Sequence, residues 1–296
     1  MIYLFLLLAS FSAFATADIK CEATYDDVGI TRQKVNSFND YYYCFGFHHG
    51  RDRAWMMDYF RRVAQGRNAE VYGYSSLKSD LMMKLLDLPK LAARLYEGLP
   101  EQNKAWLKAY AQGATLGFQE GKNSQEFKDL DYAPEDWLPE HSILVLVLQS
   151  FDQTRKTFFR DYEEEKLKEK WKDKTEELFN EDTVPWSNTI LKQGEYVTKT
   201  ESVNTSYTPA QKLKLWENFP DVFGKESGSN NWVVGKAKSK DGYAMLANDP
   251  HLDLKTPLFW YWINIQTPEM NVIGGSVPGV PVIVSGTNGK VAWGLT

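Results

Sequence analysis

The sequence has few cysteines and histidines, no cluster of basic residues, and no long apolar run beyond its first residues. It contains 2 Cys and 4 His among 296 residues, so at most a single intrachain disulfide can form. Lys and Arg number 34 against 39 Asp and Glu, and the two signs are interleaved along the middle of the chain. We therefore expect no nucleic-acid partner. With 43% hydrophobic and 14% aromatic residues, the chain can bury a sizeable core in one or two domains.

The positions of the cysteines and histidines leave little room for a metal site. Cys21 and Cys44 both lie near the N-terminus, and an exported protein can join them, but spacing alone does not show that their Cβ atoms meet. The disulfide is therefore left open. His48 and His49 are adjacent rather than four residues apart, so they do not share one face of a helix. No metal site is predicted from this pair.

Residues 1–17 have the pattern of a signal peptide. The apolar run Tyr3–Phe14 is too short to span a bilayer, and Ala15-Thr16-Ala17 offers the small residues that signal peptidase accepts. We expect cleavage after Ala17, a periplasmic or secreted mature chain, and no membrane association once the signal is removed. An uncleaved N-terminal anchor is the alternative.

The first half of the chain has the periodicity of α-helices. Asn39 or Asp40 can cap a helix that Gly66 ends, and its arginines are expected on the polar side or beside carboxylates. These arginines are Arg51, Arg53, Arg61 and Arg62. Further helices are predicted at residues 77–88, 90–98 and 101–121, and from near Pro139 onward.

The pattern changes after Val184. Residues 194–228 are polar without a steady period and are typical of a connector. Alternating, strand-like segments follow, and the first two flank Ser239-Lys240-Asp241-Gly242, where Asp-Gly favours a hairpin turn. A helical region, a connector and a strand region therefore follow one another in that order.

Ser229 stands where the connector meets the first strand. If the bond between Gly228 and Ser229 is broken, Ser229 gains an α-amino group with a pKa of about 7.7–8.0, which can accept the proton of its own hydroxyl. Gly228 permits the strained backbone that an N→O acyl shift requires. A flexible Gly-Ser joint is the alternative, and the dipeptide alone does not decide between them.

Four segments make the sequence resemble the penicillin acylase family of N-terminal-nucleophile hydrolases. They read GFHHGRDRAWMMDYFRRVAQGRNAEVYG, YAPEDWLP, GSNNWVVGKAKSKDGYAMLANDPHL and SVPGVPVIVSGTNGKVAWGLT, and the resemblance runs from about Tyr25 to Thr296. It implies an α+β fold of the αββα-sandwich type. Residues 18–190 would form the helical α-subunit region, residues 191–228 a spacer peptide, and residues 229–296 the first strands of the β-subunit.

The resemblance also implies how this precursor is processed. Ser229 matches the nucleophile that becomes the first residue of the β-subunit after autocatalytic cleavage between Gly228 and Ser229, which leaves an α/β heterodimer. His251 matches a position where family members have Gln or His to help hold the serine's amino group. A surface-loop histidine is the alternative reading of His251.

Four further positions match the family's acyl pocket, and ordinary core packing is the alternative for all of them. They are Phe151, Leu252, Ser285 and Leu295. Leu252 and Ser285 do not provide the aromatic wall of phenylacetyl-selective members, so an aliphatic acyl group is favoured.

The implied reaction is hydrolysis of an N-acyl amide, such as a penicillin or an acyl-homoserine lactone, through an acyl-serine intermediate. It uses no cofactor for catalysis; family members often carry a structural calcium, for which no ligand is assigned in this sequence. The family's oxyanion donors match positions beyond Thr296, so we expect most of the β-subunit to lie outside this sequence. The alternatives are a truncated inactive fragment or pseudoenzyme, and a non-catalytic exported binding protein.

Overall fold

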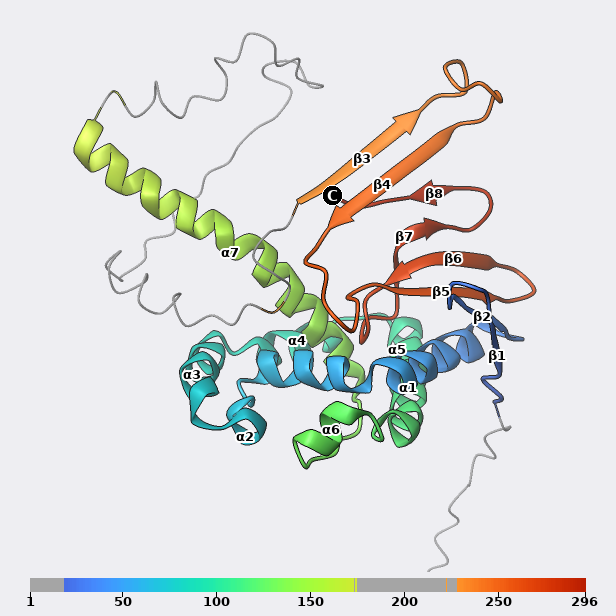
Figure 1. The fold of residues 1–296 in the computed structure, drawn as a ribbon, viewed down its shortest axis with the longest axis horizontal. Coiled ribbons are helices and arrows are strands. Elements are labelled where there is room, and N and C mark those ends of the chain that lie inside the picture. Colours follow the sequence, from blue (N-terminus) through green and yellow to red (C-terminus); the bar gives the residue numbers. More distant parts are fainter. Residues whose placement is uncertain (1–18, 173, 175–221, 223–227) are drawn as a thin grey trace, which may run out of the picture.

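The computed structural model describes residues 19–172, 174, 222 and 228–296, in which a group of helices lies beside a group of strands (Figure 1). The predicted signal peptide, residues 1–17, and nearly all of the predicted spacer, residues 191–228, lie outside the described residues. No helix within the described part is long and apolar enough to cross a membrane. Helices come first and most strands come last, which confirms the predicted α+β class.

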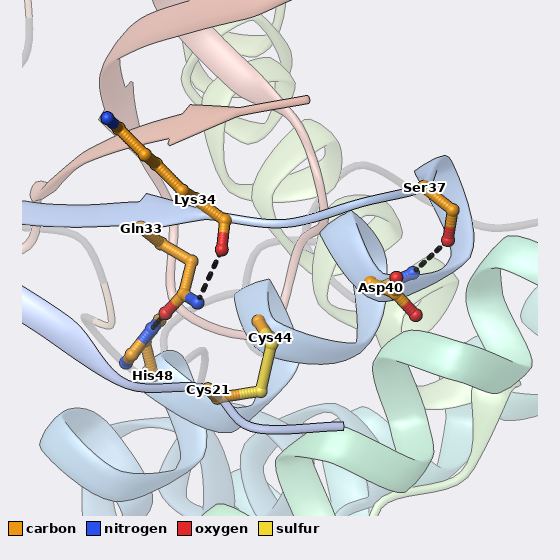
Figure 2. The surroundings of a disulfide bond; sticks show 7 residues. All are labelled: Cys21, Gln33, Lys34, Ser37, Asp40, Cys44 and His48. Carbon is orange, nitrogen blue, oxygen red and sulfur yellow. Dashed lines mark hydrogen bonds between the residues drawn. A yellow bond between two sulfur atoms is a disulfide. The ribbon is translucent and has the colours of Figure 1, made fainter. Parts of the chain in front are cut away.

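The helical region follows the predicted order. Its elements are α1 (Phe38–Gln65), α2 (Ala69–Tyr72), the 3₁₀ turn η1 (Gly73–Ser76), α3 (Leu77–Leu86), α4 (Leu88–Glu97), α5 (Glu101–Gly121), α6 (Gln125–Asp129) and α7 (Pro139–Trp171). Gly66 ends α1 in the left-handed conformation, with φ of 62°, as predicted. The predicted cap at Asn39 or Asp40 is wrong, because the Ser37 hydroxyl accepts the backbone N–H of Asp40 (Figure 2).

Helices α1 and α5 cross at a seam of glycines. Cβ atoms placed on Gly46 and Gly50 of α1 would clash with the backbone of α5, and one on Gly113 of α5 would clash with the carbonyl oxygen of Tyr43. The two helices therefore approach closely enough for backbone to meet backbone. This contact fixes α1 against α5 and leaves the other faces of α1 to pack on α7 and the sheet.

One prediction for α1 needs correction. Arg61, expected on the polar side, is fully buried, and Arg62 is nearly so. Both pair with the buried carboxylate of Asp58, and the Arg61 guanidinium also donates to the carbonyl oxygens of Glu135 and Asp136. A buried charge is tolerated when it is paired and hydrogen-bonded in this way. The expectation of carboxylate partners was right, and the expectation of exposure was wrong for these two residues.

The strands form two sheets. A six-stranded sheet has the order β1 (Ala23–Tyr25), β2 (Thr31–Lys34), β5 (Tyr261–Gln266), β6 (Asn271–Ser276), β7 (Ile283–Thr287) and β8 (Ala292–Trp293), and a two-stranded ribbon pairs β3 (Gly228–Val234) with β4 (Met245–His251). The sandwich implied by the resemblance to the penicillin acylase family was expected to contain antiparallel sheets, and this expectation is only partly met, because β2 runs parallel to β5. A strand that arrives from a distant part of the chain is not bound to the antiparallel direction of a hairpin.

The N-terminal strands β1 and β2, which the sequence patterns did not predict, are fastened to α1. A disulfide joins Cys21 to Cys44, so the question left open by the spacing is settled in favour of the bond (Figure 2). Next to it, His48 on α1 lies 2.8 Å from the side-chain oxygen of Gln33 on β2. Strand β2 thus lies between β1 and β5 in the sheet, and the Gln33 side chain links it to α1.

Candidate active site

Ser229 is the second residue of β3 and is half-buried. Its hydroxyl donates a hydrogen bond of 2.6 Å to the carbonyl oxygen of Gly228. The predicted hairpin is confirmed, because β3 pairs with β4 in antiparallel register and Gly242 takes a positive φ of 73° in the connection. The hydroxyl therefore lies against the peptide bond that the sequence predicts will be cleaved.

His251 lies beside that same peptide bond, on the neighbouring strand. The register places His251 directly opposite Gly228, and a Cβ placed on Gly228 would lie 3.9 Å from the imidazole Nδ1. The other nitrogen, Nε2, lies 3.0 Å from the carboxylate of Asp249. Since side chains alternate along a strand, His251 and Asp249 project from one face of the ribbon and Ser229 from the other. The uncleaved chain thus brings His251 to Gly228 rather than to the serine hydroxyl.

Two of the predicted pocket residues meet at a residue that the sequence did not single out. The Ser285 hydroxyl donates to Asn248 Oδ1 at 2.6 Å, and Asn248 Nδ2 donates to the backbone carbonyl of Leu295 at 3.1 Å. Asn248 lies on the same face of the ribbon as Ser229. Its only signal in the sequence was an asparagine at the end of a strand-like segment, since asparagine is disfavoured in strands.

The other two predicted pocket residues are placed less directly. Leu252 is half-buried and follows His251 at the end of β4, and Phe151 on α7 is half-buried against the hydrophobic core. A cavity of about 230 Å³ lies between α1 and residues 253–259, and none of the four predicted pocket residues lines it. The cavity therefore does not support the predicted acyl pocket, which rests on the positions of the four residues in the sequence.

Two buried histidines connect α1 to the sheet. The Ser276 hydroxyl donates to the Tyr261 carbonyl oxygen, so it accepts the Nε2–H of His49 at 2.9 Å, and the Tyr110 hydroxyl donates to His49 Nδ1 at 2.7 Å. Burial lowers the pKa of His48 to about 4 and lowers the pKa of His49 well below its ordinary value. Both imidazoles are neutral at pH 7 and act as hydrogen-bonding groups that link α1 to β2, α5 and β6.

A calcium site does not follow from the side chains that the structure describes. Within residues 19–172, 174, 222 and 228–296, no group of three or more His, Cys, Asp or Glu side chains is placed to hold a metal ion. Calcium prefers several oxygen ligands, with carboxylates among them. No calcium ligand is therefore assigned among the described residues.

Comparison with known proteins identifies the family. The model of the family described as penicillin amidase matches residues 20–296. The chain belongs to the penicillin amidase family. The match includes both strands of the ribbon that carries Ser229 and His251, and it confirms the resemblance inferred from the four sequence segments.

Curated relatives of this penicillin amidase family member are acylases. The acyl-homoserine lactone acylase QuiP of Pseudomonas fluorescens (strain Pf0-1) is 31% identical over 279 residues, which cover 91% of this chain and 33% of that protein. The penicillin acylase 2 proenzyme of Pseudomonas sp. (strain SE83) is 28% identical over 283 residues, covering 92% and 35%. The chain therefore spans about a third of the length of these relatives.

Among solved structures, a thermostable penicillin G acylase from Alcaligenes faecalis is similar. The two are 19% identical with a TM-score of 0.45, and the match covers 63% of this chain and 97% of that chain.

Proposed function

We infer that this protein is the precursor of an amide hydrolase that removes the acyl group from an N-acyl amide, with Ser229 as its nucleophile. The observation that carries the proposal is the family match over residues 20–296, joined to the place of Ser229 at the start of a strand whose first residue faces His251. Because the chain spans about a third of the length of its curated relatives, the activity, substrate and subunits of the whole protein all belong to this proposal.

The first step is cleavage of the chain. Ser229 Oγ attacks the carbonyl carbon of Gly228, the acyl group moves from nitrogen to oxygen, and water then hydrolyses the resulting ester. The products are a carboxylate on Gly228 and a free α-amino group on Ser229, which divide the protein into an α/β heterodimer. The hydrogen bond between the Ser229 hydroxyl and the Gly228 carbonyl oxygen supports this step, because it holds the nucleophile next to the group that it attacks.

The second step is hydrolysis of the substrate. The new α-amino group, with an unperturbed pKa of about 7.7–8.0, accepts the hydroxyl proton while Oγ attacks the amide carbonyl carbon. The amine leaves with a proton, and water hydrolyses the acyl-serine without any cofactor. Departure of Gly228 opens the place opposite His251, and the imidazole then holds the amino group.

The proposed substrate is an amide with an aliphatic acyl chain, of which an acyl-homoserine lactone is an example. The side chains at Leu252, Ser285 and Leu295 support this choice, since none of them is aromatic. The name acyl-homoserine lactone acylase carried by several relatives supports it as well. Hydrolysis of such lactones would quench quorum signals outside the cytoplasm, to which removal of residues 1–17 would deliver the enzyme.

Amide hydrolysis by the protein expressed from its complete reading frame tests the proposal. Wild type and Ser229→Ala are assayed for amine release from a long-chain acyl-homoserine lactone and from a phenylacetyl amide. We expect wild type to hydrolyse the aliphatic substrate and Ser229→Ala to lose at least about 10³-fold in rate. Equal rates for the two proteins would refute the role of Ser229, and wild type without any hydrolysis would favour a pseudoenzyme or a binding protein.

A further inference from the structure

The ribbon that carries Ser229 is joined to the six-stranded sheet by side chains. Within residues 228–296 no backbone–backbone hydrogen bond crosses from β3 or β4 to that sheet. Instead, Asn231 Nδ2 donates to the carbonyl oxygen of Gly294 at 3.0 Å, and Asn248 Nδ2 donates to that of Leu295 at 3.1 Å. Asn231 and Asn248 are directly opposed across the ribbon, so two paired amides hold two consecutive peptide groups. Figure 1 shows β8 and the chain end lying beside this ribbon.

The surroundings of Asn248 fix its amide in one orientation. Ser285 Oγ donates to Asn248 Oδ1 at 2.6 Å, which directs Nδ2 toward the carbonyl oxygens of Leu295 and, at 3.2 Å, of Asn230. The approach is so close that a Cβ on Gly294 would lie 2.6 Å from the Asn248 Cβ. The position of the Asn248 amide therefore requires the hydroxyl of Ser285 and the absence of a side chain at Gly294. Such specific requirements are expected of a contact that has a structural role.

Several apolar side chains of the ribbon are largely exposed in the described part of the chain. On β3 the side chains of Trp232 and Val233 are 56% and 73% exposed, and on β4 that of Met245 is 55% exposed. These apolar groups add little packing against the sheet. The hydrogen bonds of Asn231 and Asn248 link the ribbon to the residues that follow β8, and the bond between Asn248 and Ser285 links it to β7.

We propose that Asn248 is a positioning residue. Its amide holds the ribbon that carries Ser229 in a fixed position relative to the segment that contains Ser285 and Leu295. Ser229 opposes Pro250, two residues along the ribbon from the Asn231–Asn248 pair and therefore on the same face. Loss of the amide would let the nucleophile shift relative to any substrate held by β7 and β8. This inference rests on the proposed role of Ser229 as nucleophile.

Three variants of the full-length protein test the inference. Asn248→Asp keeps the shape but replaces the donor NH₂ with a carboxylate oxygen that faces two carbonyl oxygens. Asn248→Ala removes the amide, and Gly294→Ala pushes the same contact apart from the opposite side. Val233→Ser serves as the control, since it changes an exposed residue farther along the same face of β3.

Two readouts separate positioning from simple stabilisation. Hydrogen–deuterium exchange in peptides covering residues 228–234 and 291–296 should become faster in all three variants and stay unchanged in Val233→Ser. The kcat for amide hydrolysis should fall about 10- to 100-fold while KM changes by no more than about threefold, because a small misplacement of the nucleophile affects the reaction more than binding.

The outcomes distinguish this inference from the proposed function. Unchanged exchange and unchanged kcat in Asn248→Asp and Asn248→Ala, with an active wild type, would overturn the role of Asn248 alone. Faster exchange with unchanged kcat would also overturn it, since the contact would then be structural only. Failure of wild type to hydrolyse any amide would refute the proposed function, and with it the positioning role, even if exchange became faster.

Discussion

Gly228 and His251 lie directly opposite each other in β3 and β4, with the imidazole Nδ1 3.9 Å from the place where a Gly228 side chain would begin. Gly228 is the residue that leaves when the proposed cleavage occurs. The imidazole therefore faces the departing residue before cleavage and the new α-amino group of Ser229 after it. Cleavage and hydrolysis should for this reason respond differently to a change at His251.

The first prediction concerns His251. His251→Ala should lower kcat/KM for amide hydrolysis about 10- to 100-fold, because the α-amino group loses the partner that orients it. His251→Gln, which keeps a hydrogen-bonding side chain, should retain more activity than His251→Ala. Steady-state kinetics on processed protein would measure the effect, and equal activity of wild type and His251→Ala would assign the histidine to the surface.

The second prediction concerns the disulfide between Cys21 and Cys44. Since the bond closes a loop with a sequence separation of 23, Cys44→Ser should lower the free energy of unfolding by about 3 kcal/mol in the chain-entropy model. Urea unfolding with and without a reducing agent would measure it. Reduction should destabilise wild type by a similar amount and leave Cys44→Ser unchanged; insensitivity of wild type to reduction would contradict the prediction.

The third prediction concerns the glycine seam between α1 and α5. Gly113→Ala should destabilise the protein by about 1–3 kcal/mol, because its Cβ would meet the carbonyl oxygen of Tyr43 and force the helices apart. Gly98→Ala is the matched control: its Cβ would be 3.6 Å from the nearest oxygen, an ordinary contact. Chemical denaturation would measure the free energy of unfolding of both variants. Equal values for the two variants would show that the seam tolerates a methyl group.

Local signals explain how much of the fold was predictable. Glycine, proline and apolar spacing lie within a few residues of each helix end, so the helices from Leu77 to Gly121 were predicted closely. The Asp-Gly turn likewise predicted the hairpin that brings His251 beside Gly228. The parallel pairing of β2 with β5 was missed because it joins residues more than 200 positions apart, such as Thr31 and Ile263.

The same distinction applies to the candidate site. Ser229 was predicted from the chemistry of a serine that follows a glycine at a cleavable bond, and from the four sequence segments that resemble the penicillin acylase family. Asn248 was missed because its partners are mainly backbone carbonyl oxygens, as at Leu295, and a carbonyl leaves no trace in the sequence. The burial of Arg61 was missed for a similar reason. The carbonyl oxygens that accept its hydrogen bonds belong to Glu135 and Asp136, which are more than 70 residues away in the sequence.

The fourth prediction concerns acid. Burial lowers the pKa of His48 to about 4 and that of His141 to about 3, and it lowers the pKa of His49 well below 6.5. As the pH falls, the unfolded chain therefore binds protons at these histidines before the folded chain does. The stability that the neutral histidines contribute is fully present above about pH 6.5 and is lost as the pH falls toward 4. His48 alone should account for about 3 kcal/mol at pH 4.

Urea unfolding across pH 4 to 7 would measure this loss, with His48→Gln as the comparison. The variant removes one titrating group and keeps a side-chain N–H for Gln33. Its stability should fall less steeply with acid than that of wild type. Parallel curves for the two proteins would show that His48 titrates alike in the folded and unfolded chains.

The central claim is that Ser229 becomes an N-terminal nucleophile, and the intact mass of the purified full-length protein tests it most directly. Wild type should give two fragments, and N-terminal sequencing of one of them should begin at Ser229. Ser229→Ala should remain a single uncleaved chain, because it lacks the hydroxyl that attacks Gly228. A single mass shared by wild type and Ser229→Ala, or the same two fragments from both, would contradict the account and leave Ser229 an ordinary strand residue.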